Sequence, residues 1–222
     1  MRTIKSYVIR AGRSSELQAT GLREGLPLFG LSPDEPWHME SLFGRAAPTV
    51  LEIGFGMGDA FLEMAIARPE ENFIGIEVHR AGVGSVLSQL MQKNILNVCI
   101  CMHDALNVLE HCIPDHSLDR IQLFFPDPWP KTRHHKRRIV RAEVIALIHQ
   151  KLKPEGIFHV ATDWAPYAEV IIDLMSQANG FQSLTLPAAY HERPAYRPMS
   201  KYEHRGHRLG HQVYDLMFQS RG

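Results

Sequence analysis

The stretch TVLEIGFGMGDAFLEMA, residues 49–65, carries the clearest indication of the fold in this sequence. Its first five residues are apolar or β-branched apart from one glutamate, as expected for a buried strand. Three alternate glycines follow, Gly54, Gly56 and Gly58, and a helical pattern begins at Asp59. Glycines at such a turn let a ligand approach the backbone, because no Cβ stands in the way. We therefore predict a strand, a cofactor-binding loop that contains these glycines, and a helix.

Downstream of this motif, short apolar runs alternate with helical patterns, which is typical of βα units around a mostly parallel sheet. The predicted strands span residues 49–53, 72–77, 98–103, 120–125, 157–162, 182–186 and 213–219. The predicted helices span residues 59–67, 81–94, 105–112, 141–152 and 166–178. We therefore predict an α/β fold with a single domain over residues 49–222.

Residues 1–48 have a different character, because they mix basic residues with glycine and proline, as in GLREGLPLFGLSPDEP at residues 21–36. We expect one short strand or helix followed by an irregular N-terminal arm. This arm is predicted to be an appendage and not an independent domain.

Length and composition exclude several classes of protein. A chain of 222 residues with 45% hydrophobic and 22% charged residues fits one globular domain. No apolar run has the length of a membrane span or of a signal peptide, so we expect a cytoplasmic protein without membrane association. The three cysteines, Cys99, Cys101 and Cys112, are expected to be reduced core residues.

The charges are unevenly distributed along the chain. Lysine plus arginine equals aspartate plus glutamate at 24 each, so the total charge indicates no polyanionic partner. However, KTRHHKRRIVR at residues 131–141 has no acidic residue, and RPAYRPMSKYEHRGHRLGH at residues 193–211 has only one. Clustered cations beside a predicted active site favour contact with nucleic-acid phosphates over a merely solvated loop.

Acidic residues around the glycine loop indicate which cofactor it binds. Glu77 lies about 20 residues beyond the glycines, where a carboxylate accepts hydrogen bonds from the ribose hydroxyls of a nucleoside. Glu52 and Asp59 flank the loop, and acids there disfavour a pyrophosphate and favour the cationic S-adenosylmethionine over NAD. Asp104 follows the third predicted strand and has two compatible roles, binding the adenine amino group or capping the next helix.

The fourth predicted strand runs into FFPDPWPKTRHHKRR, residues 124–138. Three prolines within five residues restrict the backbone and hold Asp127 and Trp129 in a stiff turn. The turn follows the carboxyl end of a strand, beside the predicted cofactor. We therefore expect it to be part of the active site and not a purely structural turn.

Five segments resemble the bacterial tRNA (guanine-N7)-methyltransferases, in the order that this family shows. They are LEIGFGMGDAF, GIEVHRAG, FFPDPWPKTRHHKRR, ATDW and SKYEHRGHRLGHQVYDLMF. The resemblance covers roughly residue 50 to the C-terminus, and its most specific part is PDPWPK with the histidine–arginine run. It implies a Rossmann-like class I methyltransferase sheet of seven strands with the last strand antiparallel. It also implies S-adenosylmethionine as the methyl donor and guanosine 46 in the tRNA variable loop as the target.

The resemblance also implies roles for individual residues. Asp127 is expected at the catalytic centre, and the residues expected to contact the cofactor are Glu52, Glu77, Asp104 and Asp127. Substrate guanosine is expected to contact Lys131, Asp163, Ser200, Lys201, Tyr202 and Glu203. RNA contacts are expected from Arg133, His134, His135, Lys136, Arg137 and Arg138.

The chemistry of guanine agrees with this set of residues. N7 has an in-plane lone pair and no proton, so it attacks a methyl group without a strong base. The purine becomes cationic during transfer and its N1 proton more acidic, so a carboxylate that accepts from N1-H and N2-H stabilises the transition state. The candidates are Asp127, Asp163 and Glu203; we expect Asp163 to bind this edge and Asp127 to lie nearer the sulfonium.

Aromatic residues are candidates for stacking on the extruded base, which must leave its stack in the tRNA. Trp129, Trp164 and Tyr202 are placed for this role, although each is also compatible with a partly buried core position.

Other functions remain as alternatives. They are methylation of an exocyclic base amine, a catalytically silent tRNA-binding subunit, and an NAD oxidoreductase. The histidines of HxxHxxxH, His204, His207 and His211, suggest a metal, but the interspersed glycines and the absence of a completing ligand argue against one, so we expect no metal. We expect no required protein partner and either a monomer or a homodimer.

Overall fold

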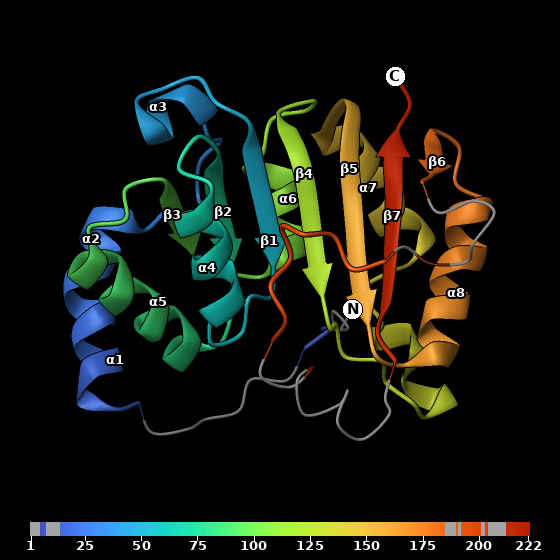
Figure 1. Ribbon diagram of the computed structural model, residues 1–222, viewed down its shortest axis with the longest axis horizontal. Coiled ribbons are helices and arrows are strands. Elements are labelled where there is room, and N and C mark those ends of the chain that lie inside the picture. Colours follow the sequence, from blue (N-terminus) through green and yellow to red (C-terminus); the bar gives the residue numbers. More distant parts are fainter. Residues whose placement is uncertain (1–4, 8–13, 185–189, 191, 201–202, 204–211) are drawn as a thin grey trace.

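The computed structural model of the chain describes residues 5–7, 14–184, 190, 192–200, 203 and 212–222. Its centre is one seven-stranded sheet with the order β3-β2-β1-β4-β5-β7-β6 (Figure 1). The strands are β1 (Thr49–Ile53), β2 (Asn72–Ile76), β3 (Val98–Cys101), β4 (Leu118–Phe124), β5 (Leu152–Thr162), β6 (Phe181–Ser183) and β7 (Tyr214–Ser220). Parallel pairing joins the first five strands, and β7 is antiparallel to both β5 and β6. The predicted fold class is confirmed, including the antiparallel last strand.

Helices cover both faces of the sheet. They are α4 (Asp59–Ala67), α5 (Arg80–Lys93), α6 (Ala105–His111), α7 (Ala142–Lys151) and α8 (Ala165–Ser176). Successive side chains of β1 point to opposite faces of the sheet and therefore pack in two different cores. Leu51 packs in the hydrophobic cluster that contains α6, α7 and α8, and Val50 packs in the one that contains α4 and α5. β1 and α4 have the predicted bounds, the start of β5 shifts by five residues, and the other boundaries of the predicted elements shift by at most three. Residues 185 and 186 of the predicted strand 182–186 lie outside the described residues.

The N-terminal region is more regular than the arm expected from the sequence. Helix α1 (Glu16–Thr20), a π-helical turn (Gly21–Gly25) and α2 (Leu26–Phe29) form one continuous run of helical backbone. It packs on α5 so closely that a Cβ on Gly21 would lie 2.1 Å from the carbonyl oxygen of Gly84. The glycines that looked like loop residues are therefore required where two helices touch, and this contact outweighs the low helix propensity of glycine.

After α2 the chain follows the edge of the sheet. Gly30 forms a parallel bridge with Ile100 of β3, and the amide of Leu31 donates to the carbonyl of Ile100 at 2.8 Å. Trp37 is buried, and a short helix, α3 (Met39–Phe43), leads into β1. The three cysteines are buried and unpaired, as predicted. In the described part of the chain, no helix combines the length and the hydropathy that a membrane span requires.

Candidate active site

A cavity of about 820 Å³ opens at the carboxyl ends of the parallel strands. It lies at the switch point of the sheet, because β2 and β3 lie on one side of β1 whereas β4 and the later strands lie on its other side. Open α/β sheets bind their ligands at such a point. The glycine loop, the end of β2 and the turn after β4 line it. Its lining includes Gly54, Gly56, Glu77, His103, Asp127 and Trp129.

The glycine loop has the conformation that the sequence predicted. Gly54, Gly56 and Gly58 have φ of +75°, +60° and +81°, a region that disfavours any side chain. A Cβ on Gly54 or Gly56 would meet nothing within 4 Å, whereas one on Gly58 would lie 2.0 Å from Cγ2 of Val86. The first two glycines therefore keep the cavity floor open for a ligand, and the third lets the loop pack on α5.

Glu77 stabilises this loop from the end of β2. One carboxylate oxygen accepts from the amide of Gly56 at 2.9 Å, and the other accepts from the amides of Val78 and His79 at 2.6 and 2.8 Å. A carboxylate oxygen has two lone pairs, so the oxygen bound to Gly56 retains acceptor capacity toward the cavity. Glu77 is thus able to orient the loop and to accept from a ligand hydroxyl.

Glu52 and Asp104 are placed differently from Glu77. Glu52 is 3% exposed, Oε2 of its side chain has no hydrogen-bond partner within the described residues, and burial raises its pKa to about 8. Asp104 caps α6, because its Oδ1 accepts from the amide of Leu106 at 3.0 Å. Neither Glu52 nor Asp104 lines the cavity, but His103 and Ala105, on either side of Asp104 in the sequence, do. The capping role of Asp104 is confirmed, and the cofactor contacts of Asp104 and Glu52 stay predictions.

The turn after β4 combines proline rigidity with unusual backbone angles. Phe125 and Trp129 both have positive φ, +51° and +44°, and they bracket the exposed Asp127. Each such residue costs on the order of 1–3 kcal/mol, so the surrounding structure must hold the turn in place. The guanidinium of Arg138 is part of that support, since it donates to the carbonyl of Pro128 at 2.8 Å and lies 4.7 Å from the ring centroid of the buried Tyr167.

Residues 5–7 close one side of this turn. The indole N–H of Trp129 donates to the carbonyl of Ser6 at 3.2 Å, and Arg137 donates to the carbonyls of Lys5 and Tyr7 at 3.2 and 3.0 Å. The same guanidinium stacks 3.9 Å from the centroid of the Trp129 ring. Ser6 and Tyr7 are therefore cavity residues that the sequence motifs did not indicate.

The basic run forms a short 3₁₀ helix, Thr132–Arg137, beside the turn. Lys131, Arg133 and Lys136 are exposed; His134, His135 and Arg137 are partly buried; and Arg138 is buried. Desolvation, followed by the charges of Arg133 and Arg137, lowers the pKa of His134, so this ring is neutral near pH 7. The six residues expected to touch RNA therefore do not present a uniform surface, because Arg138 supports the turn.

Two further segments reach the carboxyl ends of the strands. Asp163 follows β5 and is exposed, next to Trp164 with an exposed fraction of 40%. Ser200 and Glu203 form a capping box, in which the amide of Glu203 donates to Oγ of Ser200 at 3.1 Å and the amide of Ser200 donates to the Glu203 carboxylate at 2.8 Å. Lys201, Tyr202 and the three histidines of the HxxHxxxH pattern lie outside the described residues.

Comparison with known proteins places the chain in a family. The family model described as "Putative methyltransferase" matches residues 46–216. The tRNA (guanine-N(7)-)-methyltransferase of Pseudomonas savastanoi pv. phaseolicola is 54% identical over 219 residues, which is 98% of this chain and 90% of that protein. The protein of the same name from Pseudomonas putida is 53% identical over 222 residues, which is 100% of this chain and 92% of its own length. The chain belongs to this methyltransferase family.

Solved structures agree with this assignment at the level of the fold. The 16S rRNA (adenine(1408)-N(1))-methyltransferase from Catenulisporales acidiphilia has a TM-score of 0.58 and 15% identity, covering 86% of this chain and 92% of that one. The 16S rRNA methyltransferase KamB has a TM-score of 0.57 and 13% identity, covering 83% and 93%. These distant neighbours share the sheet and do not identify the substrate.

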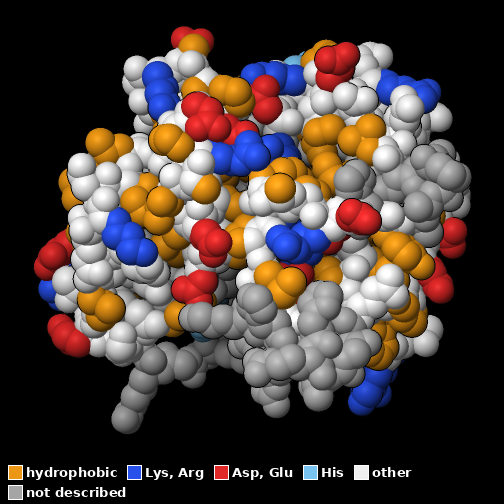
Figure 2. Space-filling model, in the orientation of Figure 1, with side chains coloured by type: hydrophobic (Ala, Val, Ile, Leu, Met, Phe, Trp, Pro, Cys, Tyr) orange, Lys and Arg blue, Asp and Glu red, His pale blue; other side chains and the backbone are white. Residues whose placement is uncertain are grey.

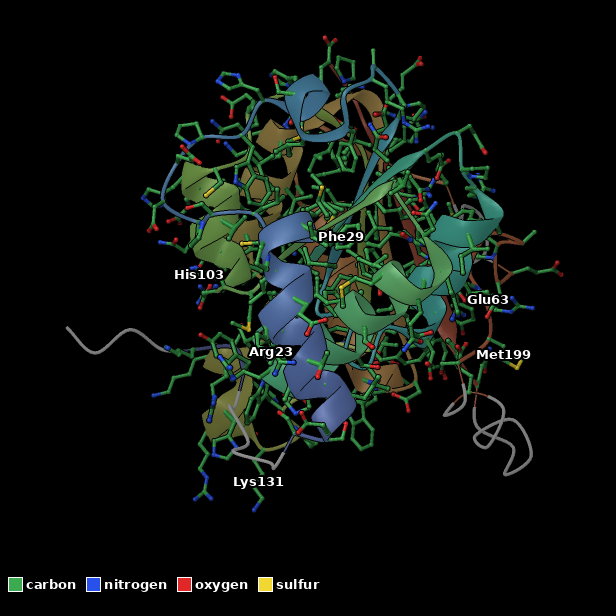
Figure 3. The ribbon with its side chains drawn as sticks, turned by 90° about the vertical axis from the view of Figure 1, so that its left-hand side faces the viewer. Arg23, Phe29, Glu63, His103, Lys131 and Met199 are labelled. Atoms are coloured by element: carbon green, nitrogen blue, oxygen red, sulfur yellow. The ribbon has the colours of Figure 1, made fainter. Side chains whose placement is uncertain are left out.

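Within this methyltransferase fold, the predicted site residues fall into two groups. Gly54, Gly56, Glu77 and Asp127 line one cavity, whereas Lys131, Asp163, Ser200 and Glu203 belong to segments outside the cavity lining. In Figure 3, His103 and Lys131 lie on one side of the molecule, and Glu63 and Met199 lie on the other.

The sequence analysis did not name His103 as a site residue, although it lines the cavity and its buried Nδ1 has no hydrogen-bond partner among the described residues. Its position at the end of a predicted strand, one residue before Asp104, was the available signal.

Proposed function

We propose that this protein transfers a methyl group from S-adenosylmethionine to N7 of a guanine in tRNA, namely guanosine 46 of the variable loop. The observation that carries the proposal is the placement of Asp127. A stiff turn holds this exposed carboxylate in the lining of the cavity of about 820 Å³, directly before the basic run. The relatives named as tRNA (guanine-N(7)-)-methyltransferases support the same reaction.

The residues of the cavity fit S-adenosylmethionine. Gly54 and Gly56 leave open space where other residues would place a Cβ, and Glu77 retains acceptor capacity. The buried Nδ1 of His103 has no hydrogen-bond partner among the residues that the structure describes. Gly54, Gly56 and Glu77 would hold the nucleoside part, with Asp104 adding negative charge nearby. Glu52, whose pKa burial raises to about 8, would take part as a protonated carboxyl group. When bound, this group supplies an electrophilic methyl group on a sulfonium.

The protein's own task is to orient the guanine and to stabilise its developing charge. N7 needs no general base, so the useful carboxylates are those that strengthen their hydrogen bonds as the purine becomes cationic. Asp163 is exposed directly after β5, and we assign it to N1-H and N2-H, a bidentate match for a carboxylate. Asp127 is assigned to the cofactor side of the reacting atoms. Lys131 and the segment Ser200–Glu203 would orient the nucleoside from the two sides of the cavity.

Phosphate binding is assigned to the exposed part of the basic run. Lys131, Arg133 and Lys136 are exposed and carry the positive charge, and the partly buried Arg137 adjoins them. His134 and His135 would contribute hydrogen bonds. We assign Arg138 to support of the turn because it is 7% exposed. With tRNA as substrate, we infer that the protein acts in the cytoplasm, without a protein partner, as a monomer or a homodimer.

The decisive experiment is methyl transfer from labelled S-adenosylmethionine to an unmodified tRNA transcript, followed by nucleoside digestion and cleavage mapping. Label in N7-methylguanosine at position 46 supports the proposal. Label in N6-methyladenosine or another methylated amine would replace it with methylation of an exocyclic base amine. A titration with S-adenosylmethionine that shows no saturable heat would indicate a catalytically silent tRNA-binding subunit.

A further inference from the structure

One face of the second half of the sheet lacks a helix in the part of the chain that the structure describes. On β5, Phe158 and Val160 pack in the core that contains α6, α7 and α8, so His159 between them faces the other way. Residues 192–200, between β6 and β7, cover this face, and Figure 1 shows them, in orange, crossing in front of β4 and β5 and descending toward the carboxyl ends of these strands. Figure 2 shows the same face, with acidic and basic side chains interspersed on it.

Arg197 anchors this covering segment to the sheet. Its Nε and Nη2 donate to the two carboxylate oxygens of Asp215 on β7, at 2.7 and 2.8 Å. Its Nη1 donates to Oε1 of Glu203 at 2.7 Å. The exposed fractions of Arg197, Asp215 and Glu203 are 1%, 1% and 3%, so all three groups are removed from water. A planar guanidinium is suited to this arrangement, because it bonds one carboxylate in a bidentate manner and still reaches a second.

His159 completes the network on the sheet side. Its Nε2 lies 2.8 Å from Oδ1 of Asp215, and its Nδ1 lies 2.7 Å from the hydroxyl of Tyr196. A carboxylate only accepts, so Nε2 carries the proton and the hydroxyl of Tyr196 donates to Nδ1. Burial lowers the pKa of His159 despite the adjacent Asp215, which agrees with a neutral ring. Asp215 thus accepts from both His159 and Arg197, and its orientation on β7 is determined.

The other end of the network is the capping box. Both oxygens of Glu203 have donors, Oε1 from Arg197 and Oε2 from the amide of Ser200. The carboxylate is therefore buried with a donor on each oxygen, in contrast to the exposed carboxylates of Asp127 and Asp163. Glu203 joins Arg197 to the backbone at Ser200, and so a rigid connection runs from β5 and β7 to the segment that we assign to the substrate.

We propose that Arg197 is a positioning residue for methyl transfer, which acts through Glu203 by holding the Ser200 turn at the carboxyl end of the sheet. Only the expected effect on the rate of methyl transfer rests on the proposed function. In this inference Glu203 orients the turn at Ser200, and Asp163 remains the carboxylate that binds the guanine edge. Arg197, Asp215 and His159 have no assigned contact with cofactor or substrate, so we assign their effect on the reaction to this connection. The Arg197 guanidinium also lies 5.7 Å from the ring centroids of the cavity residues Phe124 and Phe125.

The experiment is a double-mutant cycle with Arg197→Lys, Glu203→Gln and the double variant. Lysine retains the charge but not the bidentate geometry, and glutamine retains the shape of Glu203 but not its charge. Lys151→Gln is the matched control, because Lys151 is a buried cation that donates to Asp115 at 2.7 Å near the amino ends of β4 and β5. Four quantities are measured for each protein: the melting temperature, the affinity for S-adenosylmethionine, kcat/KM with tRNA, and amide hydrogen exchange of residues 199–203.

We expect each single variant to lower kcat/KM by about 100-fold, since a displacement of about 1 Å in an orienting group has effects of this size. The double variant should be no slower than the slower single variant, because both changes break one connection. Amide hydrogen exchange at residues 199–203 should accelerate, while S-adenosylmethionine affinity stays within about twofold. Lys151→Gln should lower the melting temperature without lowering kcat/KM.

Two outcomes overturn the inference. Additive losses in kcat/KM would show that Arg197 and Glu203 act independently. Unchanged exchange at residues 199–203 in both single variants would show that Arg197 does not hold the turn, and this readout needs no catalysis. If the wild-type protein transfers no methyl group to tRNA, the proposed function fails, while the exchange measurement still decides whether the anchor exists. Should Arg197→Lys fail to fold, Glu203→Gln alone provides the exchange and kinetic tests.

Discussion

Replacement of Gly82 by alanine tests how the cofactor loop is supported. Gly82 lies in the first turn of α5, and a Cβ there would be 1.9 Å from the carbonyl oxygen of Gly56. Ordinary contact begins at 3.4 Å, so the loop and the helix must separate by about 1.5 Å. The shift would also strain the bond from the Gly56 amide to Glu77. Overpacking of this kind costs about 1–3 kcal/mol, partly offset by the gain of at most about 1 kcal/mol for alanine over glycine in a helix.

The larger effect of Gly82→Ala should appear in cofactor binding. A displacement of more than 1 Å at a binding loop corresponds to losses of about 100-fold, so we expect the S-adenosylmethionine affinity in isothermal titration to fall by that order. The matched control is Gly84→Ala, two residues along the same helix, whose Cβ would meet the carbonyl of Gln18 at 2.2 Å. It should destabilise the fold by a similar amount and spare cofactor affinity. Equal cofactor affinity in wild type and Gly82→Ala would refute the reasoning.

Three further predictions concern single side chains. Asp127→Ala should reduce turnover by at least about 100-fold, with little change in melting temperature or tRNA affinity, and equal losses of turnover and affinity would instead point to a structural role. Arg137→Glu should weaken tRNA binding and reduce by about one unit the slope of log affinity against log salt concentration. Arg138→Ala should leave this slope unchanged and lower the melting temperature, because it removes the hydrogen bond to Pro128. A slope altered by both variants would contradict the different roles assigned to the two arginines. Burial raises the pKa of Glu52 from 4.5 to about 8, so the native state favours its protonated form, and the stability from this group is complete below pH 4.5 and lost as the pH rises to 8. Glu52→Gln should therefore melt at a temperature that rises relative to wild type between pH 5 and pH 8, and calorimetry curves that stay parallel over this range would count against it.

Local patterns in the sequence predicted the elements that depend on local chemistry. The strand and helix on either side of the glycine loop were predicted with their observed bounds, because apolar periodicity and glycine position are properties of a few adjacent residues. The same holds for the capping role of Asp104 and the position of Asp127 in a stiff turn. The α/β class followed from the alternation of such elements along the chain.

Features that depend on contacts between distant residues were not predictable in this way. The helical conformation of residues 21–29 requires the approach of Gly21 to Gly84, 63 positions along the chain. Arg138 belongs to a run of cations in the sequence, but the ring of Tyr167 and the carbonyl of Pro128 bury its guanidinium. Glu203 looked like a free acid among basic residues until Arg197 and Asp215 were placed around it. Tertiary contacts assign these roles, and no spacing within the sequence encodes them.

The bridge between Gly30 and Ile100 bears on how this protein avoids self-association. β3 is the outermost strand on its side of the sheet, and an uncovered outer strand offers unpaired backbone groups to a strand from another molecule. The chain after α2 occupies that position, with the amide of Leu31 bound to Ile100 and the buried Trp37 a few residues further on. Residues 30–37 therefore cover the outer edge of β3 and protect it from pairing with a strand of another molecule. We expect removal of residues 1–36 to produce a protein that forms β-rich aggregates at concentrations where the whole chain stays dispersed.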